Sequence, residues 1–599
     1  MNSNLLCCKF AAVKRVQRLL RSGRLRANLC CLLAAAAIAL LVATGDTVRP
    51  AMAQNSTSPR DSVVRVRVRA DQPDGKLSPV WAYFGYDEPN FTYSADGRRL
   101  LGELASMSRG PVRVRTHNLL TSGDGTPALK WGSTNAYTED SAGKPVYDWT
   151  ILDRIFDAYR DAGVVPLVEI GFMPQALSTH PDPYQHHWPK GSLWAGWAYP
   201  PKDYSKWGEL VRQWVLHAEQ RYGRKAAASW YWEVWNEPDI GYWQGTPEEY
   251  FMLYDYAADG VKRAIPEARI GGPATTGPGN PRAADFLRKF LAHCETGANY
   301  VTGRTGSPLD FISFHAKGST HVVDGHVELN VRKQIKDIAE GFEIVSSSEK
   351  FRGLPVILTE SDPEGCAACD AISHPENGYR NSPQYASYEA ETLDASLELA
   401  ARKKINLAGV LTWAFEFEGQ PYFAGFRALA TNSVDLPVLN AFRIFGLMGG
   451  ERIAAESSAA LPLEEVMYSS VRSSSDVNVL ATRTSDTVNA LVWNYHDDEV
   501  PAPDAPVQLL VEGLPTSAKR VLVEHYRVDG TASNSYAAWK AMGSPANPSL
   551  GQIQQLRAAG ELQLLSSPEW KDVKEGSVQL NFTLPRQAVS LVDISWAAE

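Results

Sequence analysis

The chain has 599 residues, with 59 Lys and Arg against 68 Asp and Glu, and 44% of its residues are hydrophobic. This composition is typical of a globular protein and excludes a disordered, collagen-like or multi-span membrane protein. At roughly 150 residues per domain the length allows about four domains, but one α/β barrel takes roughly 250 residues or more, so two or three are equally compatible.

The first 53 residues differ from the rest and are typical of an export signal. Basic residues precede an uncharged apolar run of 15 residues at 29–43, and the small-x-small triplet AMA follows at 51–53. A membrane-spanning helix needs about 20 apolar residues, so we predict a secretory signal at 1–53 and a periplasmic or secreted protein. We expect no stable membrane insertion after cleavage; an uncleaved anchor is the alternative.

Removal of residues 1–53 changes both the charge and the cysteine content. The remainder holds 51 basic and 67 acidic residues, a net charge of −16. Nucleic acids and anionic membranes are therefore poor candidate partners. Of seven cysteines, Cys294, Cys366 and Cys369 remain, which excludes a disulfide scaffold and a four-cysteine zinc site.

Residues 62–70 read SVVRVRVRA, with valine and arginine in alternation. A period of two predicts a strand with one buried and one solvated face. We assign this strand to an N-terminal segment, residues 54–79, and expect it to join a sheet formed by the end of the chain. The arginine row is most simply a solvated face, with a surface for an acidic polymer as the alternative.

From residue 80 onward, short apolar runs alternate with amphipathic helical patterns in eight units. The predicted strands are Val80–Tyr86, Val112–Asn118, Val165–Phe172, Trp230–Asn236, Ala268–Pro273, Leu309–His315, Pro355–Glu360 and Ala408–Phe415. Predicted helices between them include Trp149–Ala162, Tyr204–Tyr222, Pro247–Ile265, Val331–Ser346 and Tyr385–Lys403. Eight β-then-α units predict a closed (β/α)8 TIM barrel over residues 80–446, with an open doubly wound sheet as the alternative.

After residue 446 the pattern changes to short β-type runs separated by Gly, Pro, Asp and Ser. The runs are Val488–Tyr495, Val507–Leu514, Val521–Val528, Val578–Leu584 and Val589–Trp596. They predict an accessory antiparallel β-sandwich over residues 447–599. No low-complexity linker precedes it, so we expect it to dock firmly on the barrel.

Two glutamates end predicted barrel strands four and seven. The segment WEVWNEP at 232–238 places Asn236 and Glu237 at the barrel mouth, because Pro238 cannot continue a β-ladder. The segment LPVILTESDP at 354–363 places Glu360 there as well. These strands lie on opposite sides of the barrel, so the two carboxyls face each other across a sugar-sized gap. Glycoside hydrolysis needs one carboxyl to protonate the leaving oxygen and another to attack or stabilise the oxocarbenium carbon.

These motifs resemble glycoside hydrolase family 39, the β-xylosidase and α-L-iduronidase family, over nearly the whole mature chain. Further segments that carry the resemblance are 246–264, 271–275, 312–318, 357–366 and 434–448. Residues 125–137 and the tryptophan-rich loop 174–203 are most similar to bacterial β-xylosidases. The resemblance implies a retaining mechanism in which Glu237 is the general acid/base and Glu360 the nucleophile. As the acid, Glu237 is expected to stay protonated near the working pH.

The resemblance also implies a set of substrate-binding residues. Asn236 is expected to hydrogen-bond the sugar 2-hydroxyl, and Trp413 to form a platform under the ring, with core packing as its alternative. The expected set is His117, Phe172, Asn236, His315, Lys317, Trp413, Glu416, Glu418 and Arg427. For the two histidines the alternative is a structural role.

Four of these residues bear on the choice of sugar. Lys317 and Arg427 match positions that hold a substrate carboxylate in iduronidase-like members. Alternatively, both cations pair with Glu416 or Glu418, which are close in sequence to Arg427. One of these two glutamates is expected to bind a distal sugar hydroxyl.

Cys366 and Cys369 form a Cys-x-x-Cys motif just beyond Glu360. In an exported chain this predicts a small disulfide that braces the loop, with two free thiols as the alternative. A metal is less favoured, because few other ligands remain and this type of hydrolysis needs none. We expect no cofactor.

The sequence thus predicts an exported retaining exo-glycosidase acting on an oligosaccharide, which removes xylose from the non-reducing ends of xylo-oligosaccharides. An α-L-iduronidase with the same mechanism is the first alternative. A non-catalytic carbohydrate-binding protein is an alternative of another class, and it would require the loss of a catalytic carboxylate.

Overall fold

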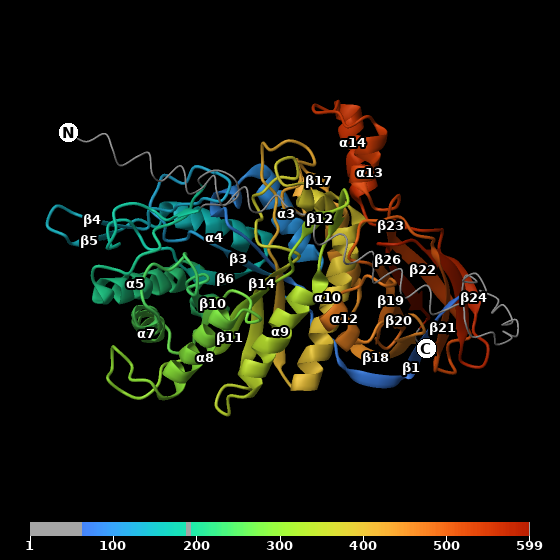
Figure 1. Cartoon of the computed structure of the whole chain (residues 1–599), viewed down its shortest axis with the longest axis horizontal. Helices are drawn as coiled ribbons and strands as arrows, with labels where there is room; N and C mark the ends of the chain where they lie inside the picture. Colours follow the sequence, from blue (N-terminus) through green and yellow to red (C-terminus); the bar gives the residue numbers. More distant parts are fainter. Residues whose placement is uncertain (1–62, 187–192, 598–599) are drawn as a thin grey trace, which may run out of the picture. The chain divides into compact units, whose positions relative to one another are not determined.

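A computed structural model describes residues 63–186 and 193–597, which belong to one compact unit (Figure 1). The predicted signal at 1–53 lies outside the described residues, as do residues 187–192 of the tryptophan-rich loop. Among the helices that the structure describes, none has the length and apolar character needed to cross a membrane.

Eight parallel strands close into a barrel. They are β2 (Tyr83–Tyr86), β3 (Arg113–Thr116), β6 (Val165–Ile170), β9 (Tyr231–Val234), β10 (Arg269–Thr275), β11 (Phe311–Lys317), β14 (Pro355–Asp362) and β15 (Asn406–Thr412). They pair in chain order, and Leu411 of β15 lies opposite Tyr83 of β2 to complete the circle. The predicted (β/α)8 barrel is therefore confirmed, and the open-sheet alternative is wrong.

Helices lie between the barrel strands in the chain and surround them (Figure 1). They are α3 (Ala95–Ser106), α4 (Thr150–Ala162), α5 (Tyr204–Tyr222), α6 (Arg224–Ser229), α7 (Pro247–Ala264), α8 (Pro281–Thr296), α9 (Val331–Ser346), α10 (Pro383–Lys403) and α11 (Pro437–Leu447). The five helices predicted by range are all present. Local sequence explains the start of α7, where Thr246 and Glu249 form a capping box that satisfies two free backbone N–H groups.

The end of the chain and its first described strand build a ten-stranded sheet. Its strands are β1 (Val64–Lys76), β18 (Glu451–Ser457), β19 (Asp476–Arg483), β20 (Thr487–Tyr495), β21 (Ala505–Glu512), β22 (Arg520–Val528), β23 (Gln563–Leu564), β24 (Glu569–Asp572), β25 (Val578–Leu584) and β26 (Val589–Ser595). In Figure 1 the blue β1 lies beside the orange and red C-terminal strands. The barrel with an accessory β-sandwich is thus present, although β1 runs parallel to β21 and makes the sheet only mostly antiparallel.

The alternation of valine and arginine in β1 sorts its side chains between two environments. The valines at 64, 66 and 68 are buried in the core of the sheet. On the opposite face, Arg67 pairs with Glu512 at 2.7 Å and Arg69 with Glu456 at 2.6 Å. The arginine row is a solvated face partly neutralised by neighbouring strands, which leaves little free charge for an acidic polymer.

Strand β20 connects the sheet to the barrel because both of its faces are buried. Val488, Ala490 and Val492 enter the core of the sheet. On the other face, Leu491, Trp493 and Tyr495 enter the core of the barrel. Trp493 Nε1 also donates to Glu391 Oε2 of α10 at 2.8 Å. This shared burial explains the firm docking expected from the absence of a linker, while the division at residue 446 stays a prediction.

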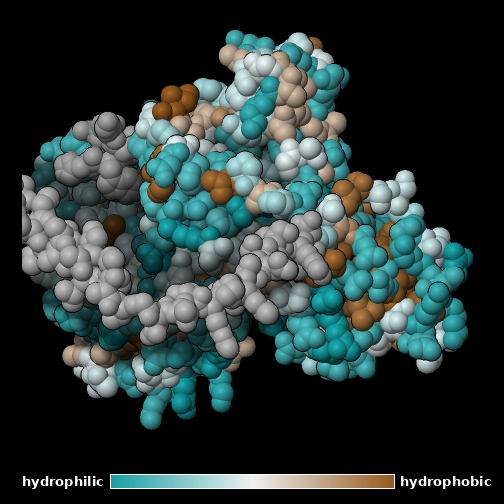
Figure 2. Space-filling view, turned by 45° about the vertical axis from the view of Figure 1, so that its right-hand side comes forward, coloured by the Kyte–Doolittle hydropathy of each residue, from teal (hydrophilic) through white to brown (hydrophobic). Residues whose placement is uncertain are grey.

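The surface is mainly hydrophilic on the face shown in Figure 2, where hydrophobic residues form separate groups. The exposed large hydrophobic side chains include Ile372, Tyr468, Leu550 and Trp570. Such scattered apolar residues are normal on a protein surface.

Candidate active site

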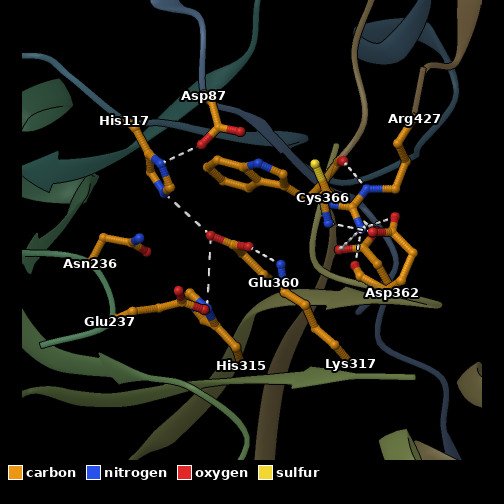
Figure 3. Close-up of polar contacts among 12 residues, drawn as sticks. Asp87, His117, Asn236, Glu237, His315, Lys317, Glu360, Asp362, Cys366 and Arg427 are labelled. Atoms are coloured by element: carbon orange, nitrogen blue, oxygen red, sulfur yellow. Dashed lines mark hydrogen bonds and ion pairs between the residues drawn. The ribbon is translucent and has the colours of Figure 1, made fainter. Parts of the chain in front are cut away.

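Glu237 and Glu360 meet at the C-terminal mouth of the barrel (Figure 3). Glu237 follows the end of β9, and Glu360 lies near the end of β14. One carboxylate oxygen of each and a ring nitrogen of His315 all lie within 4.8 Å of one another. The two carboxyls therefore face each other as the sequence predicts.

The backbone around Glu237 is strained. Trp235 and Glu237 have φ values of 73° and 43°, which L-residues rarely adopt. The conformation is held by hydrogen bonds from Glu237 N to Ala274 O at 2.9 Å and from Trp235 Nε1 to Tyr242 O at 2.9 Å. These contacts direct the carboxyl of Glu237, at the barrel mouth, toward Glu360.

Glu360 is a buried carboxylate among cations. The ammonium of Lys317 contacts Oε2, and Oε1 lies 3.2 Å from both Arg115 Nη1 and His117 Nε2. Burial by itself would raise the pKa of Glu360, but the charges of His315 and Lys317 and the contact with His117 hold it well below its usual value. Glu360 is thus ionised, as an attacking carboxylate must be.

The pKa of Glu237 reflects two opposing influences, burial and the contact with His315. Burial favours the protonated form, but His315 Nδ1 donates a hydrogen bond to Oε1 at 2.9 Å, and this bond and the charge of His315 lower the pKa below its usual value. In the unliganded protein the balance therefore favours the ionised carboxylate near neutral pH, and the expected protonation of Glu237 near the working pH stays a prediction. Its protonated fraction grows only in acidic solution.

Arg115 is a central residue of the site that sequence reasoning missed. It is fully buried on β3, where Nε pairs with Glu233 at 2.5 Å and Nη2 with Glu169 at 3.1 Å. Nη2 also donates to Asn236 Oδ1 at 3.1 Å. The signal was present in the sequence, because a charged residue whose side chain enters the interior of a barrel must find buried partners.

Burial also affects the pKa values of Glu169 and His117, which lie beside Arg115. It raises the pKa of Glu169 to about 7, despite the opposing charges of His117 and Arg115. It would lower the pKa of His117, but the charges of Glu169 and Asp87 outweigh it and raise that pKa to about 9. His117 Nδ1 lies 2.7 Å from Asp87, which in turn pairs with Lys130 at 2.8 Å. Sequence reasoning missed Asp87 and Lys130 as well.

Two predicted aromatic residues pack against His117. The ring centroids of Trp413 and His117 are 4.4 Å apart, and those of Phe172 and His117 are 5.9 Å apart. The guanidinium of Arg115 lies 5.1 Å from the Trp413 ring. The structure thus brings together His117, Phe172, Asn236, Glu237, His315, Lys317, Glu360 and Trp413.

Arg427 lies apart from the carboxylate pair. Its fully buried guanidinium donates to Trp413 O at 2.7 Å and pairs with Glu364 at 3.1 Å. Lys317 pairs with Glu360 instead. The alternative in which these two cations pair with the glutamates at 416 or 418 is therefore wrong.

Glu416 and Glu418 also lie outside the cluster of the two catalytic candidates. Glu416 is fully buried, pairs with Arg99 at 2.9 Å and accepts from Ser433 N at 2.6 Å. Glu418 is exposed, and its carboxylate accepts from Asp96 N at 3.5 Å. A direct sugar contact is thus unsupported for Glu416, whose carboxylate is already occupied.

Cys366 and Cys369 form a disulfide, which confirms the predicted brace over the free-thiol alternative. The same loop is also held by buried Arg380, whose guanidinium donates to the carbonyls of Cys366 and Cys369, each at 2.6 Å. The disulfide is therefore one of several restraints on the segment beyond Glu360.

Glu237, His315 and Glu360 are the sole group in the described part of the chain with ligand-type atoms close enough to hold a metal ion. However, Lys317 and Arg115 already contact the two oxygens of Glu360. These cations oppose the approach of another positive ion. The expectation that the chemistry needs no metal stays a prediction.

Comparisons with known proteins agree with this geometry. The chain is 27% identical to a β-xylosidase of Geobacillus stearothermophilus over 470 residues, which cover 76% of this chain and 82% of that protein. It is 25% identical to the α-L-iduronidase of Mus musculus over 533 residues, 83% of this chain and 76% of the relative.

The fold is shared with the crystal structure of a monomeric β-xylosidase from Caulobacter crescentus. The TM-score is 0.70 at 24% identity, over 89% of this chain and 100% of that one. The family model described as glycosyl hydrolases family 39 matches residues 64–571. Because this match spans most of the chain and includes both glutamates, the protein belongs to glycosyl hydrolases family 39 and is a glycoside hydrolase.

Proposed function

We propose that the protein is a retaining exo-β-xylosidase. The observation that carries the retaining mechanism is the approach of Glu237 and Glu360, whose nearest oxygens lie within 4.8 Å. Retaining glycosidases hold their two carboxyls about 5–5.5 Å apart, whereas inverting enzymes need about 6.5–9.5 Å to admit water between carboxyl and sugar. The short separation favours direct attack by Glu360.

In the first step, an oxygen of Glu360 attacks the anomeric carbon while the bond from that carbon to the leaving oxygen breaks. Glu237, in its protonated form, gives its proton to the leaving oxygen. Lys317 and Arg115 fix the two oxygens of Glu360. The product is a covalent glycosyl-enzyme and a free alcohol.

In the second step, water attacks the anomeric carbon, Glu237 takes a proton from that water, and Glu360 leaves as a carboxylate. The negative charge of Glu360 raises the pKa of Glu237 in the free protein. That charge disappears when Glu360 becomes an ester. The pKa of Glu237 then falls further, which suits its role as the base.

Xylose is supported as the sugar by the names of the relatives, which include β-xylosidases of Geobacillus stearothermophilus and Caldicellulosiruptor saccharolyticus. An α-L-iduronidase is the second candidate. It is favoured by Lys317, a cation beside the catalytic pair whose side chain is 13% exposed. Arg427 gives this candidate less support, because its guanidinium is wholly buried and paired. From residues 1–53 we also propose that the enzyme acts outside the cytoplasm.

The test is a panel of nitrophenyl glycosides that compares β-xyloside, β-glucoside, α-L-arabinoside and α-L-iduronide. We expect kcat/KM for the xyloside to exceed that for the iduronide by at least about tenfold, a difference of ~1.4 kcal/mol in transition-state binding. NMR of the first product formed should show retained anomeric configuration. A faster iduronide reaction would overturn the choice of sugar, and an inverted product would overturn the mechanism.

Lys317→Met separates the two candidates. Because Lys317 contacts Glu360, its loss should slow hydrolysis of every glycoside. An additional loss specific to the iduronide would show that Lys317 also binds the substrate carboxylate.

A further inference from the structure

Lys130 is a buried cation on a loop that the mechanism above does not use. Its side chain is 7% exposed, and Nζ lies 2.8 Å from Asp87 Oδ2. Its backbone N–H donates to Glu88 Oε1 at 2.7 Å. Burial of an ammonium group is costly unless it is paired, so this arrangement fixes Asp87 as firmly as Lys130.

The loop that carries Lys130 is itself fixed to the barrel. Asn90, just after β2, donates from Nδ2 to Ser133 O at 2.9 Å and accepts at Oδ1 from Ser133 N at 2.9 Å. Ser133 Oγ accepts from Gly125 N at 3.0 Å. Lys130 thus extends from a well-anchored backbone, which lets it hold a partner in one position.

Asp87 links Lys130 to the catalytic pair. Its second oxygen, Oδ1, lies 2.7 Å from His117 Nδ1, and His117 Nε2 lies 3.2 Å from Glu360 Oε1. Figure 3 shows these contacts in line, from Asp87 through His117 to Glu360. An ionised carboxylate is only an acceptor, so His117 Nδ1 carries a proton and the imidazole plane is set by Asp87.

The other charged groups around His117 do not set that orientation. Arg115 Nη1 and Glu169 Oε2 contact the Nε2 side of the ring, at 3.0 Å and 3.2 Å. Glu360 lies on that side too. Among the charged side chains that contact His117 in the described chain, Asp87 is thus the one that lies at Nδ1.

We propose that Lys130 is a positioning residue of the glycosidase site, which holds Asp87 so that His117 directs Nε2 at the nucleophile Glu360. Lys130 touches none of the reacting groups itself. The inference rests on the proposed two-carboxylate mechanism and adds that full activity also requires Lys130, which lies away from the reacting groups. Lys130 should therefore act through His117 and not independently of it.

A double-mutant cycle tests this dependence. We expect Lys130→Met to lower kcat/KM by at least about tenfold, mainly through kcat, and His117→Gln to lower it further. The double variant should be within about twofold of His117→Gln, since Lys130 has nothing left to position. Lys130→Arg, which keeps the charge, should restore most of the activity.

Lys206→Met is the matched control, because Lys206 also pairs with a carboxylate, that of Glu139 at 2.7 Å, but lies outside the catalytic cluster. Its kcat/KM should equal that of the unmodified enzyme. Losses that multiply in the double variant, or equal losses in Lys130→Arg and Lys130→Met, would overturn the proposal. Asp87→Asn provides a second route if Lys130→Met folds poorly, and it should show the same dependence on His117.

A second measurement does not depend on activity. In ¹⁵N-edited NMR, the His117 Nδ1 proton, assigned with His117→Gln, should be protected from exchange in the unmodified protein and in Lys130→Arg. It should exchange faster in Lys130→Met. An unchanged exchange rate would overturn the positioning role. If the unmodified protein hydrolyses none of the glycosides, the proposed function fails, while this measurement still tests the link from Lys130 to His117.

Discussion

Glu237 and Glu360, the two glutamates proposed as catalytic, have the same side chain but different surroundings. Glu360 contacts an ammonium, a guanidinium and an imidazole, whereas the side chain that hydrogen-bonds Glu237 among the described residues is His315. Charge around Glu360 keeps it ionised at any working pH. Burial raises the pKa of Glu237 and its hydrogen bond lowers it. The protonation of Glu237 is therefore the one that pH and substrate control.

His315→Asn should move the pH profile. His315 lowers the pKa of Glu237, so its removal should raise that pKa and shift the alkaline limb of kcat/KM to higher pH. The readout is the midpoint of the limb, because a lost sugar contact would change only the height. His217→Asn is the control: it breaks a pair with Asp153 at 2.6 Å away from the catalytic cluster and should leave the midpoint unchanged. An unchanged midpoint in His315→Asn would contradict the assignment.

Glu237→Ala should distinguish substrates by their leaving groups. Nitrophenolate departs with little protonation, so its glycoside should lose much less kcat/KM than xylobiose does. Steady-state kinetics on the two substrates measure the difference. Equal losses would show that Glu237 is not the acid.

At the level of elements, the segment after β14 is held by more than its disulfide. A bridge that closes so short a loop contributes at most about 2 kcal/mol. Buried Arg380 donates to backbone carbonyls at Cys366, Cys369 and Gly425. Loss of that guanidinium would leave several buried acceptors unpaired, at about 1–3 kcal/mol each.

We therefore expect Arg380→Met to destabilise the protein more than the double change Cys366→Ser and Cys369→Ser. The double serine variant should stay folded and lose less than about threefold in kcat/KM, ~0.7 kcal/mol. Thermal melts and xyloside kinetics compare the two variants. Unfolding of the serine variant, with Arg380→Met unaffected, would show that the disulfide and not Arg380 is the main restraint on this segment.

At the level of the whole molecule, acidic residues lie where the ten-stranded sheet packs on α10. Glu391 accepts from Trp493 Nε1 and shares a hydrogen bond with Asp476 of β19. Burial raises the pKa of Glu391 well above its usual value and that of Asp476 to about 6. One proton between the two carboxyls stabilises this contact.

This pair should make the folded state more stable in mildly acidic solution. A carboxyl whose pKa is raised by folding stabilises the fold when protonated, and that contribution is lost as pH rises through the folded-state pKa. The free energy of unfolding in urea should therefore fall by about 1–3 kcal/mol between pH 5 and pH 8. Glu391→Gln should reduce this fall, and a variant with an unchanged pH dependence would exclude the pair as its source.

Local pattern was enough to predict the eight barrel strands, the five helices and the positions of Glu237 and Glu360. Strand and helix periods depend on neighbouring residues, and Pro238 cannot belong to a β-ladder wherever its strand is placed, although β9 already ends at Val234. The sequence also indicated that β1 joins the distant C-terminal strands, because its buried valine face requires a sheet to complete it.

The network of buried ion pairs around the two glutamates could not be predicted from local sequence pattern. Arg115 is 118 residues from Glu233 and 245 residues from Glu360 in the chain, and Lys130 is 43 residues from Asp87. Which acid each buried cation meets depends on how the barrel closes, as the pairing of Lys317 with Glu360 shows. The pKa of Glu237 has the same origin, because burial and the contact with His315 act in opposite directions and exist only after the strands have come together.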